Sequence, residues 1–250
     1  MTAAFPHMFL HDIAFSYDVE GQVGMGELEI DEELRIPGTR LVRPSILATV
    51  ADVVAGGVAN RISAPRIPLT VDLTIHTFGG VTVDVVTIVG RAVKAGRSTI
   101  LTEVTFFELG VERPVALSHA TFLPSPNAAH EMEFVGSQPH RPSNLRGPIA
   151  EQMGIRVIRP GITEVDRVEY VMQPTGTVQG GAQAVLAEVA AETLMGEPVL
   201  DLDMRFVNAI RVGPARASAE LVAAGIARVE IRDPGNNDRL ATVALAKAAG

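Results

Sequence analysis

The chain has no cysteine and no tryptophan, and aromatic residues make up only 4% of its 250 positions. The absence of cysteine excludes a disulfide framework, a thiolate zinc site and a cysteine nucleophile. Because aromatics are scarce, the core must be built from aliphatic side chains, which suits β-strands packed around alanine-rich helices. The length allows one large domain or two small ones.

Long apolar runs and an excess of basic charge are also missing. No segment approaches the roughly 18 uninterrupted apolar residues of a membrane helix. Residues 1–9 lack the basic flank and the apolar stretch of a signal peptide. The net charge of −8 repels nucleic acid phosphates. We therefore expect a cytoplasmic protein without a membrane or nucleic acid partner, in which any anionic ligand would need a local basic cluster.

Several catalytic motifs are absent as well. The sequence has no Gly-x-Ser-x-Gly elbow, no Walker loop and no Gly-x-Gly-x-x-Gly after a strand. His7 and His11 stand four positions apart but without the glutamate of a zinc-binding helix, and the other histidines are scattered. No metal site is predicted.

What the chain does contain is two segments with the same order of elements, which indicates an internal repeat. Each has extended residues, then one long helix, then three or four alternating strands. Residues 124–148 between them are rich in Pro, Ser, Asn and His and indicate a linker. The predicted domains are therefore 1–123 and 149–250. The helices are expected at 45–61 and 182–195, with a short one at 149–153, and the strands at 15–34, 69–78, 81–93, 99–109, 115–123, 154–158, 165–172, 199–207, 215–223, 227–232 and 241–247.

The first long helix predicts how the sheet is arranged. Residues 46–58 are apolar on nearly all sides, which is typical of a buried helix. Their alanines and glycines leave little bulk, so a curved antiparallel sheet can close around them. The pattern predicts an α+β fold, a double hotdog in which two tandem antiparallel sheets each wrap around one long central helix.

The second half resembles the PaaI-like family of hotdog thioesterases. The resemblance lies in Met-Gly-Ile-Arg-Val-Ile at 153–158, in Gly-Thr-Val-Gln-Gly-Gly at 176–181 and in Leu-Ala-Glu at 186–188. Family members typically carry Gly-Thr-x-His-Gly-Gly at this turn and a carboxylate nine positions after the His. Here Gln179 stands at the His position, and Glu188 follows nine positions later.

The first half shows the same spacing in more eroded form. Arg43-Pro44-Ser45 replaces His-Gly-Gly, and Asp52 lies nine positions after Arg43. Residues 90–97 resemble the Gly-Arg…Gly-Arg strand of the same family. The likeness covers most of both halves except the linker. It implies an acyl-CoA thioesterase that releases a free acid and CoA at a site between two hotdog units, without any cofactor beyond the CoA of its substrate.

Thioester hydrolysis needs donors for the developing oxyanion and a carboxylate that activates water or attacks the carbonyl. Gly180 and Gly181 at a helix N-terminus fit the first role, because the N–H groups there have no helical partner. Glu188 lies about 12 Å further along the same helix, which is too far to act with them. The carboxylate must therefore come from a partner helix, and the resemblance implies a site at the interface of two hotdog units to which each contributes one part.

Two composite sites are possible. One combines Gly180 and Gly181 with Asp52, and the other combines Glu188 with the turn at Arg43 and Pro44. Because proline has no backbone N–H, the second site lacks a donor, and we expect one competent site. There Asp52 acts as general base or as nucleophile, which the sequence leaves open. Glu188 and Glu192 could instead form a solvated stripe on the helix surface.

Further residues are assigned more loosely. Gln179 can orient groups but cannot titrate near neutral pH, so activity would be weak if the family's His shuttles protons. Gln173 falls where relatives often have Asn near the water or the carbonyl. A basic cluster for the CoA phosphates is expected from Arg91, Lys94 and Arg97, since the matching stretch of the second half has no basic residue.

Two other functions remain open. A non-catalytic acyl-CoA-binding protein with eroded sites would explain Arg43, Pro44 and Gln179. A hotdog hydratase or dehydratase is less favoured, because such enzymes pair an Asp with a His on the helix and neither long helix here contains His. Fused hotdog units often pair again, which leaves a homodimer of the chain open.

Overall fold

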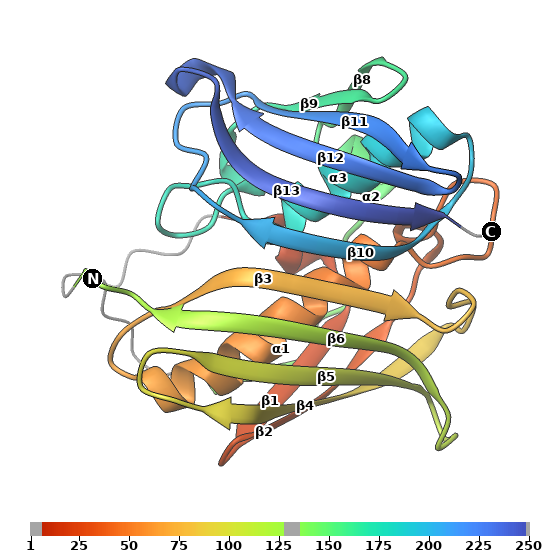
Figure 1. The fold of residues 1–250 in the computed structure, drawn as a ribbon. Coiled ribbons are helices and arrows are strands. Elements are labelled where there is room, and N and C mark those ends of the chain that lie inside the picture. The colour runs from red at the N-terminus through yellow and green to blue at the C-terminus, as the bar shows by residue number, and fades with distance from the viewer. Residues whose placement is uncertain (1–6, 128–135, 249–250) are drawn as a thin grey trace.

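The computed structural model describes residues 7–127 and 136–248. Two long helices, α1 (Pro44–Ser63) and α3 (Gly180–Met195), lie beside a large antiparallel sheet (Figure 1), and α2 (Ile149–Gln152) is short. Four short 3-10 helices are η1 (Phe9–Asp12), η2 (Glu32–Leu34), η3 (Glu169–Val171) and η4 (Pro234–Asn236). The strands are β1 (Phe15–Glu20), β2 (Val23–Glu29), β3 (Pro68–Thr77), β4 (Val85–Ala95), β5 (Ile100–Glu108), β6 (Pro114–Pro124), β7 (Ser137–Gln138), β8 (Arg156–Arg159), β9 (Ile162–Val165), β10 (Val199–Phe206), β11 (Ala215–Ala223), β12 (Ile226–Asp233) and β13 (Arg239–Ala248).

All described strands belong to one sheet, in the order β7-β1-β2-β4-β5-β6-β3-β10-β13-β12-β11-β9-β8. The prediction of two separate sheets is therefore corrected. Residues 72–76 of β3 pair with residues 201–205 of β10 and join the halves. Each of these strands would otherwise be an edge with unpaired backbone groups, and their pairing satisfies both.

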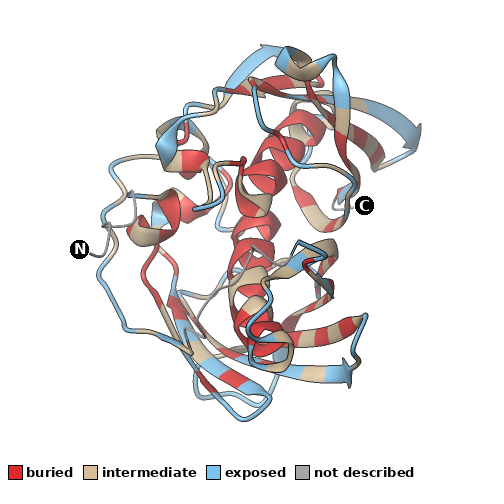
Figure 2. Ribbon diagram, turned by 90° about the vertical axis from the view of Figure 1, so that its left-hand side faces the viewer, coloured by how far each residue is buried: buried red, intermediate tan, exposed pale blue. Residues whose placement is uncertain are grey.

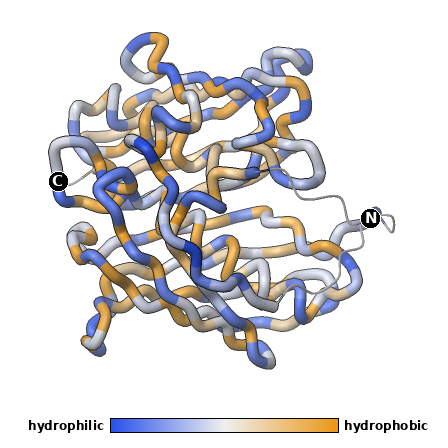
Figure 3. The backbone as a smooth tube through the Cα atoms, turned by 180° about the vertical axis from the view of Figure 1, so that it is seen from behind, coloured by the Kyte–Doolittle hydropathy of each residue, from blue (hydrophilic) through white to orange (hydrophobic). Residues whose placement is uncertain are grey.

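Each long helix packs on the strands of its own half, and the two helices also contact each other. Figure 2 shows them in the middle of the molecule with most of their surface buried. The sheet approaches α1 closely at Gly24 and Gly90, where an added Cβ would lie 2.9 Å from Cγ1 of Val54. Along the strands, hydrophobic and hydrophilic residues alternate (Figure 3), so one face of the sheet covers the helices.

The helix α1 is long and apolar enough to cross a membrane by length and composition. However, 72% of that stretch is buried inside the molecule, as in the core helix of a soluble protein. Its burial explains why its apolar residues cover nearly all sides rather than a single stripe.

Four strand predictions differ from the structure. The extended stretch expected at 15–34 is a hairpin of β1 and β2 followed by η2. Residues 81–84 do not belong to β4, because the backbone of Val81 and Asp84 bonds instead to the loop at Val42 and Ile30. The strand expected at 165–172 is wrong: β9 ends at Val165, where its pairing with β11 ends, and η3 follows. The linker contributes the short strand β7, paired with β1, which its composition did not indicate.

Candidate functional site

A cavity of about 310 Å³ lies where the two halves meet. Helix α1 and the start of β3 form one side, and the turn before α3 and the end of β10 form the other. Its lining residues are Asp52, Ile67, Pro68, Leu69, Thr70, Val71, Gln173, Thr175, Thr177, Val178, Gly180, Gln183, Phe206, Val207, Asn208 and Ala209. Nine of these residues are apolar or glycine and seven are polar, so the cavity offers a small molecule both an apolar surface and hydrogen-bonding groups.

Asp52 is the one carboxylate in this lining. Its neighbours Ala51 and Val54 are fully buried in the core, and this packing fixes the direction in which Asp52 leaves the helix. The hydroxyl of Thr70 donates a hydrogen bond to Oδ1 of Asp52 at 2.8 Å. Burial raises the pKa of Asp52 to about 6, and the bond from Thr70 opposes the rise. At neutral pH, Asp52 is therefore mostly an ionised carboxylate of unusually high basicity.

Thr70 meets Asp52 because β3 contains an irregularity at this point. Thr70 pairs with Phe122 of β6, but the next pair joins Asp72 to Thr121, so Val71 is an extra residue. A β-bulge of this kind changes the direction of the neighbouring side chains and is frequent beside active sites. The sequence analysis missed Thr70, since the register shift leaves no mark in the hydrophobic pattern.

The N-terminus of α3 faces Asp52 across the cavity. An added Cβ on Gly180 would lie 3.9 Å from Oδ2 of Asp52 and 3.2 Å from Cζ of Phe206, so only a glycine leaves this backbone open. The helix has no side-chain cap. Within the described part of the chain, the N–H groups of Gly180 and Gly181 donate to no protein acceptor. This positive helix end can therefore accept an oxygen atom that carries negative charge.

The other predicted residues of the turn lie in different surroundings. Gln173 lines the cavity, and its Nε2 donates to Oγ1 of Thr177 at 2.6 Å. Gly181 packs against Thr49 of α1, whose Oγ1 would lie 2.5 Å from an added Cβ, so this glycine allows the helices to approach. Gln179 is not in the lining, and its buried Oε1 has no hydrogen-bond partner.

The second composite site is filled by side chains. Glu188 is fully buried, and its Oε1 lies 2.6 Å from Nη1 of Arg43. Its Oε2 accepts a hydrogen bond from the backbone N–H of Ser45 at 3.0 Å. Arg43 also binds Glu192 at 3.1 Å. The solvated stripe proposed for Glu188 and Glu192 is wrong, because Glu188 has no exposed surface.

Glu192, one of the two glutamates in this cluster, has a raised pKa. Burial and the neighbouring Glu188 raise its pKa to about 7, against the opposing effect of Arg43. One guanidinium thus serves two carboxylates, and its attraction does not cancel the effects of burial and of Glu188 on the pKa of Glu192.

The expected basic cluster does not line the cavity. Arg91, Lys94 and Arg97 are exposed, and Arg91 is paired with Glu103 at 2.7 Å. The distance from the cavity to the turn that contains Arg97 follows from the pairing of the strands. Thr70 of β3 pairs with Phe122 of β6, Phe122 pairs with residue 100 of β5, and residue 100 pairs with residue 95 of β4. Three strand spacings amount to about 14 Å, so the turn with Lys94 and Arg97 lies well outside the lining.

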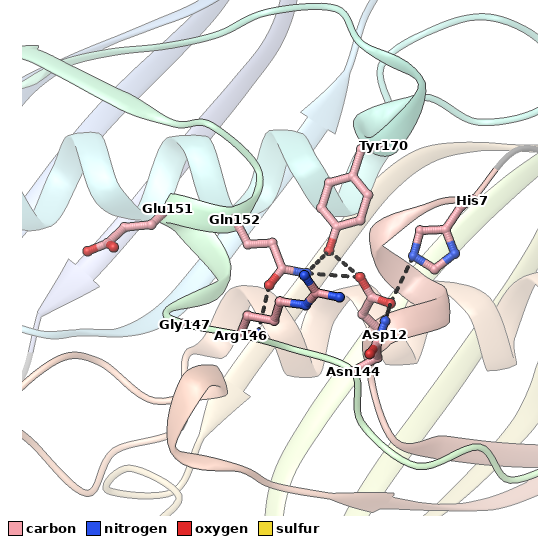
Figure 4. A pocket seen from close by; sticks show the side chains of 8 residues that line it. All are labelled: His7, Asp12, Asn144, Arg146, Gly147, Glu151, Gln152 and Tyr170. Atoms are coloured by element: carbon pink, nitrogen blue, oxygen red, sulfur yellow. Dashed lines mark hydrogen bonds and ion pairs between the residues drawn. The ribbon is translucent and has the colours of Figure 1, made fainter.

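A second cavity, of about 540 Å³, surrounds Asp12 (Figure 4). Residues from η1, the linker, α2 and η3 meet here. The carboxylate of Asp12 accepts bonds from Tyr170, Gln152 and Asn144 at 2.7, 2.9 and 3.2 Å and pairs with His7 at 2.9 Å. Four donors occupy all its lone-pair positions. Asp12 therefore ties the N-terminal segment to the second half and is not available as a base.

No group of three or more His, Asp or Glu side chains that could hold a metal occurs among residues 7–127 and 136–248. The cavity at Asp52 contains one carboxylate and no histidine. The polar groups that the protein presents in this cavity are Asp52, the helix N-terminus and neutral side chains.

The family model described as the thioesterase superfamily matches residues 45–114, which include Asp52 and all of α1 except Pro44. No curated protein matches the chain. Among solved structures, an acyl-ACP thioesterase from Bacteroides thetaiotaomicron has 10% identity and a TM-score of 0.63, over 90% of this chain and 97% of that chain. The 12:0-ACP thioesterase from Umbellularia californica has 8% identity and a TM-score of 0.65, over 92% and 98%. A protein with a hotdog fold from Alicyclobacillus acidocaldarius has 14% identity and a TM-score of 0.56, over 94% and 96%.

These likenesses, all at low identity, show that the chain has a hotdog fold. The match to the superfamily supports a thioesterase-type activity. The acyl carrier, the acyl group and the position of the site are separate questions.

Proposed function

We propose that this protein is an acyl-CoA thioesterase with one active site, built from Asp52 of the first half and the N-terminus of α3 in the second. One observation carries the proposal: a carboxylate with a raised pKa and an open helix N-terminus line the same cavity from opposite sides. Neither half supplies both groups at this cavity, and thioester hydrolysis needs both.

The reaction follows from this arrangement. The thioester oxygen accepts hydrogen bonds from the N–H groups that begin α3, and these stabilise the negative charge that develops on it. Thr70 holds Oδ1 of Asp52, so Oδ2, which lies nearer Gly180, is free to react. A general base would take a proton from water, whose oxygen then attacks the carbonyl carbon. The C–S bond breaks, and CoA leaves as a thiolate that takes up a proton.

A nucleophilic route uses the same atoms. Oδ2 of Asp52 attacks the carbonyl carbon, CoA leaves, and water cleaves the resulting anhydride to return the free carboxylate. Both routes need Asp52 ionised, and neither needs a metal or a cofactor beyond the CoA of the substrate.

The proposal includes a tandem architecture, with one hotdog unit in residues 1–123, a linker in 124–148 and a second unit in 149–250. The packing of one long helix on each half of the sheet supports it. We place the protein in the cytoplasm, as a single chain or a homodimer, with a small-molecule substrate rather than a nucleic acid or a membrane as partner.

CoA is proposed as the carrier because of the turn between β4 and β5. Lys94 and Arg97 lie about 14 Å across the sheet from Thr70, a separation that suits the phosphates of CoA at the far end of its pantetheine arm. Two of the structural neighbours are described as acting on acyl-ACP, so the carrier protein is the competing substrate.

The test compares three donors of the same acyl group: acyl-CoA, acyl-ACP and acyl-N-acetylcysteamine. Release of free thiol is followed with each donor. We expect the highest kcat/KM with acyl-CoA and a loss of that advantage in the Lys94→Ala/Arg97→Ala variant. A preference for acyl-ACP would contradict the choice of carrier.

The same assay separates an enzyme from an acyl-CoA-binding protein, the alternative function. Asp52→Asn should remove hydrolysis, and Asp18→Asn, a matched change on the exposed face of β1, should not. Binding of acyl-CoA without hydrolysis of any chain length would favour the binding protein.

A further inference from the structure

Three residues form a row along α1 that begins at the proposed catalytic carboxylate. Residues four apart lie on the same face of a helix, so Asp52 is followed by Gly56 and then by Asn60. Gly56 retains some accessible surface, and an added Cβ on it would meet only Cε1 of Phe122, at 3.9 Å. There is consequently room beside α1 one turn beyond Asp52.

The other helix has a filled version of this row. The repeat spacing aligns Glu188 with Asp52 and Glu192 with Gly56, and Arg43 extends across both glutamates. At the proposed active site, the shorter Gln179 stands in the place of Arg43. Three replacements on this side are smaller, Gln for Arg, Asp for Glu and Gly for Glu, whereas Asn60 aligns with the smaller Gly196. Next to Asp52 and Gly56, the open site thus has smaller side chains than the filled one.

Asn60 ends the row and is unusual in its surroundings. It is only 2% exposed, and neither its Oδ1 nor its Nδ2 has a hydrogen-bond partner. A buried amide without partners is unfavourable, and such a group calls for a polar partner, which a group on a bound ligand or a water can supply.

We infer that the acyl group of the substrate lies along α1 past Gly56 and carries a polar group that Asn60 binds. The substrate class is therefore a medium-chain acyl thioester with a hydroxyl, keto or similar group toward its far end. This inference rests on the proposed function for the position of the thioester at Asp52.

The helix gives an estimate of the chain length. Asn60 lies two turns beyond Asp52, about 12 Å along the axis. An extended chain advances about 1.2 Å per bond, as a peptide residue of three bonds spans roughly 3.3–3.6 Å. The polar group is thus expected on the order of ten bonds from the thioester carbon.

The test uses binding, so it does not depend on turnover. Thioether analogues of acyl-CoA, with chains of about 6, 10 and 14 carbons, are compared with and without a terminal hydroxyl by titration calorimetry. We expect the wild type to bind the hydroxylated chain of about 10 carbons at least ~10-fold more tightly than the plain chain, since an unpaired buried amide rejects the latter. In Asn60→Leu this ratio should fall to about 1 or invert.

A second variant tests the path of the chain. Gly56→Val places two methyl groups beside Phe122 and should weaken binding of analogues with about 10 carbons at least ~10-fold, while the shortest chain keeps its affinity. Gly147→Val, where an added Cβ would meet nothing within 4 Å and the backbone is not left-handed, is the control for a new valine elsewhere.

The outcomes separate the two proposals. If the wild type and Asn60→Leu show the same ratio of affinities for hydroxylated and plain chains, Asn60 faces a buried water or another protein group, and the inference is wrong. If the ratio changes as expected but no acyl-CoA is hydrolysed, the acyl site stands and the proposed catalysis fails. If acyl-CoA is hydrolysed but Asn60→Leu does not change the selectivity, the proposed catalysis stands and the acyl site fails.

Discussion

Oε2 of Glu188 accepts a hydrogen bond from the backbone N–H of Ser45 at 3.0 Å. Ser45 is the second residue of α1, as Gly181 is the second residue of α3. One helix N-terminus in this protein is thus already occupied by a carboxylate of the opposite half. Asp52 holds the matching place at the other N-terminus, but its shorter side chain bonds to Thr70 and leaves those N–H groups free.

The first prediction concerns this difference of one methylene. Asp52→Glu should reach the N-terminus of α3 as Glu188 reaches that of α1, and so fill the position of the thioester oxygen. We expect kcat/KM to fall at least ~100-fold although a carboxylate is kept, because a displacement of about 1 Å is enough for such a loss. Asp18→Glu is the matched control. Near-normal hydrolysis by Asp52→Glu would show that the helix N-terminus does not bind the substrate oxygen.

The second prediction removes one backbone donor. Gly180→Pro copies Pro44 of the other half, and the backbone accepts it, because Gln179 has φ −66° and ψ 148°, which suit a residue before proline. Any loss of thermal stability should match that of Gly180→Ala, whose Cβ meets Phe206 in the same way, while kcat falls about 10²- to 10³-fold if this N–H stabilises the oxyanion. Gly180→Ala keeps the N–H and adds a comparable Cβ beside Phe206. Equal losses in both variants would assign the effect to steric blocking of the cavity.

The third prediction follows from the raised pKa of Asp52. If hydrolysis needs the carboxylate ionised, kcat/KM should rise with pH and level off above about 6. Folding shows the opposite trend, since the folded state binds more protons than the unfolded one between the ordinary pKa of 3.8 and about 6. The stability that protonated Asp52 contributes is lost as pH rises through this window.

Asp52→Asn should abolish hydrolysis and also remove this loss of stability. Chemical denaturation at pH 4 and pH 7 provides the check. The variant should gain stability relative to the wild type between these two values. A kinetic pKa that persists in Asp52→Asn would assign the titration to another group.

The fourth prediction tests the bond from Thr70. Its hydroxyl stabilises the ionised form of Asp52, so Thr70→Val should raise the pKa of Asp52 further. The rising limb of the pH–rate profile would then move to higher pH, which a purely structural loss would not produce. Thr74→Val, four residues further along β3, is the control.

The positions of the long helices could be predicted from the sequence, and so could the placement of Asp52 opposite Gly180. Both long helices lie within two residues of their expected ranges at each end. The argument that Glu188 is too far from its own helix N-terminus required a carboxylate from the other half, and Asp52 and Gly180 do line one cavity. Their catalytic roles stay predictions.

What could not be predicted depends on tertiary contacts. The bulge that directs Thr70 to Asp52 arises from pairing between β3 and β6, which are separated by two other strands in the sequence. The ion pair of Arg43 with Glu188 joins residues 145 positions apart. Arg43 was considered only as a replaced turn residue, because nothing local indicates that its guanidinium crosses to the other helix.

The last prediction concerns that ion pair. Glu188→Gln leaves Arg43 with Glu192 alone and weakens the cap on α1, and breaking a buried pair in this way costs about 3–5 kcal/mol. We expect a large drop in thermal stability, measured by calorimetry, with kcat per folded molecule close to that of the wild type. Glu197→Gln, an exposed change beyond the end of the same helix, should alter neither quantity. Glu188→Gln could instead abolish hydrolysis in a stable protein while Asp52→Asn retains it. In that case the active site was assigned to the wrong one of the two composite sites, since the working carboxylate would be Glu188.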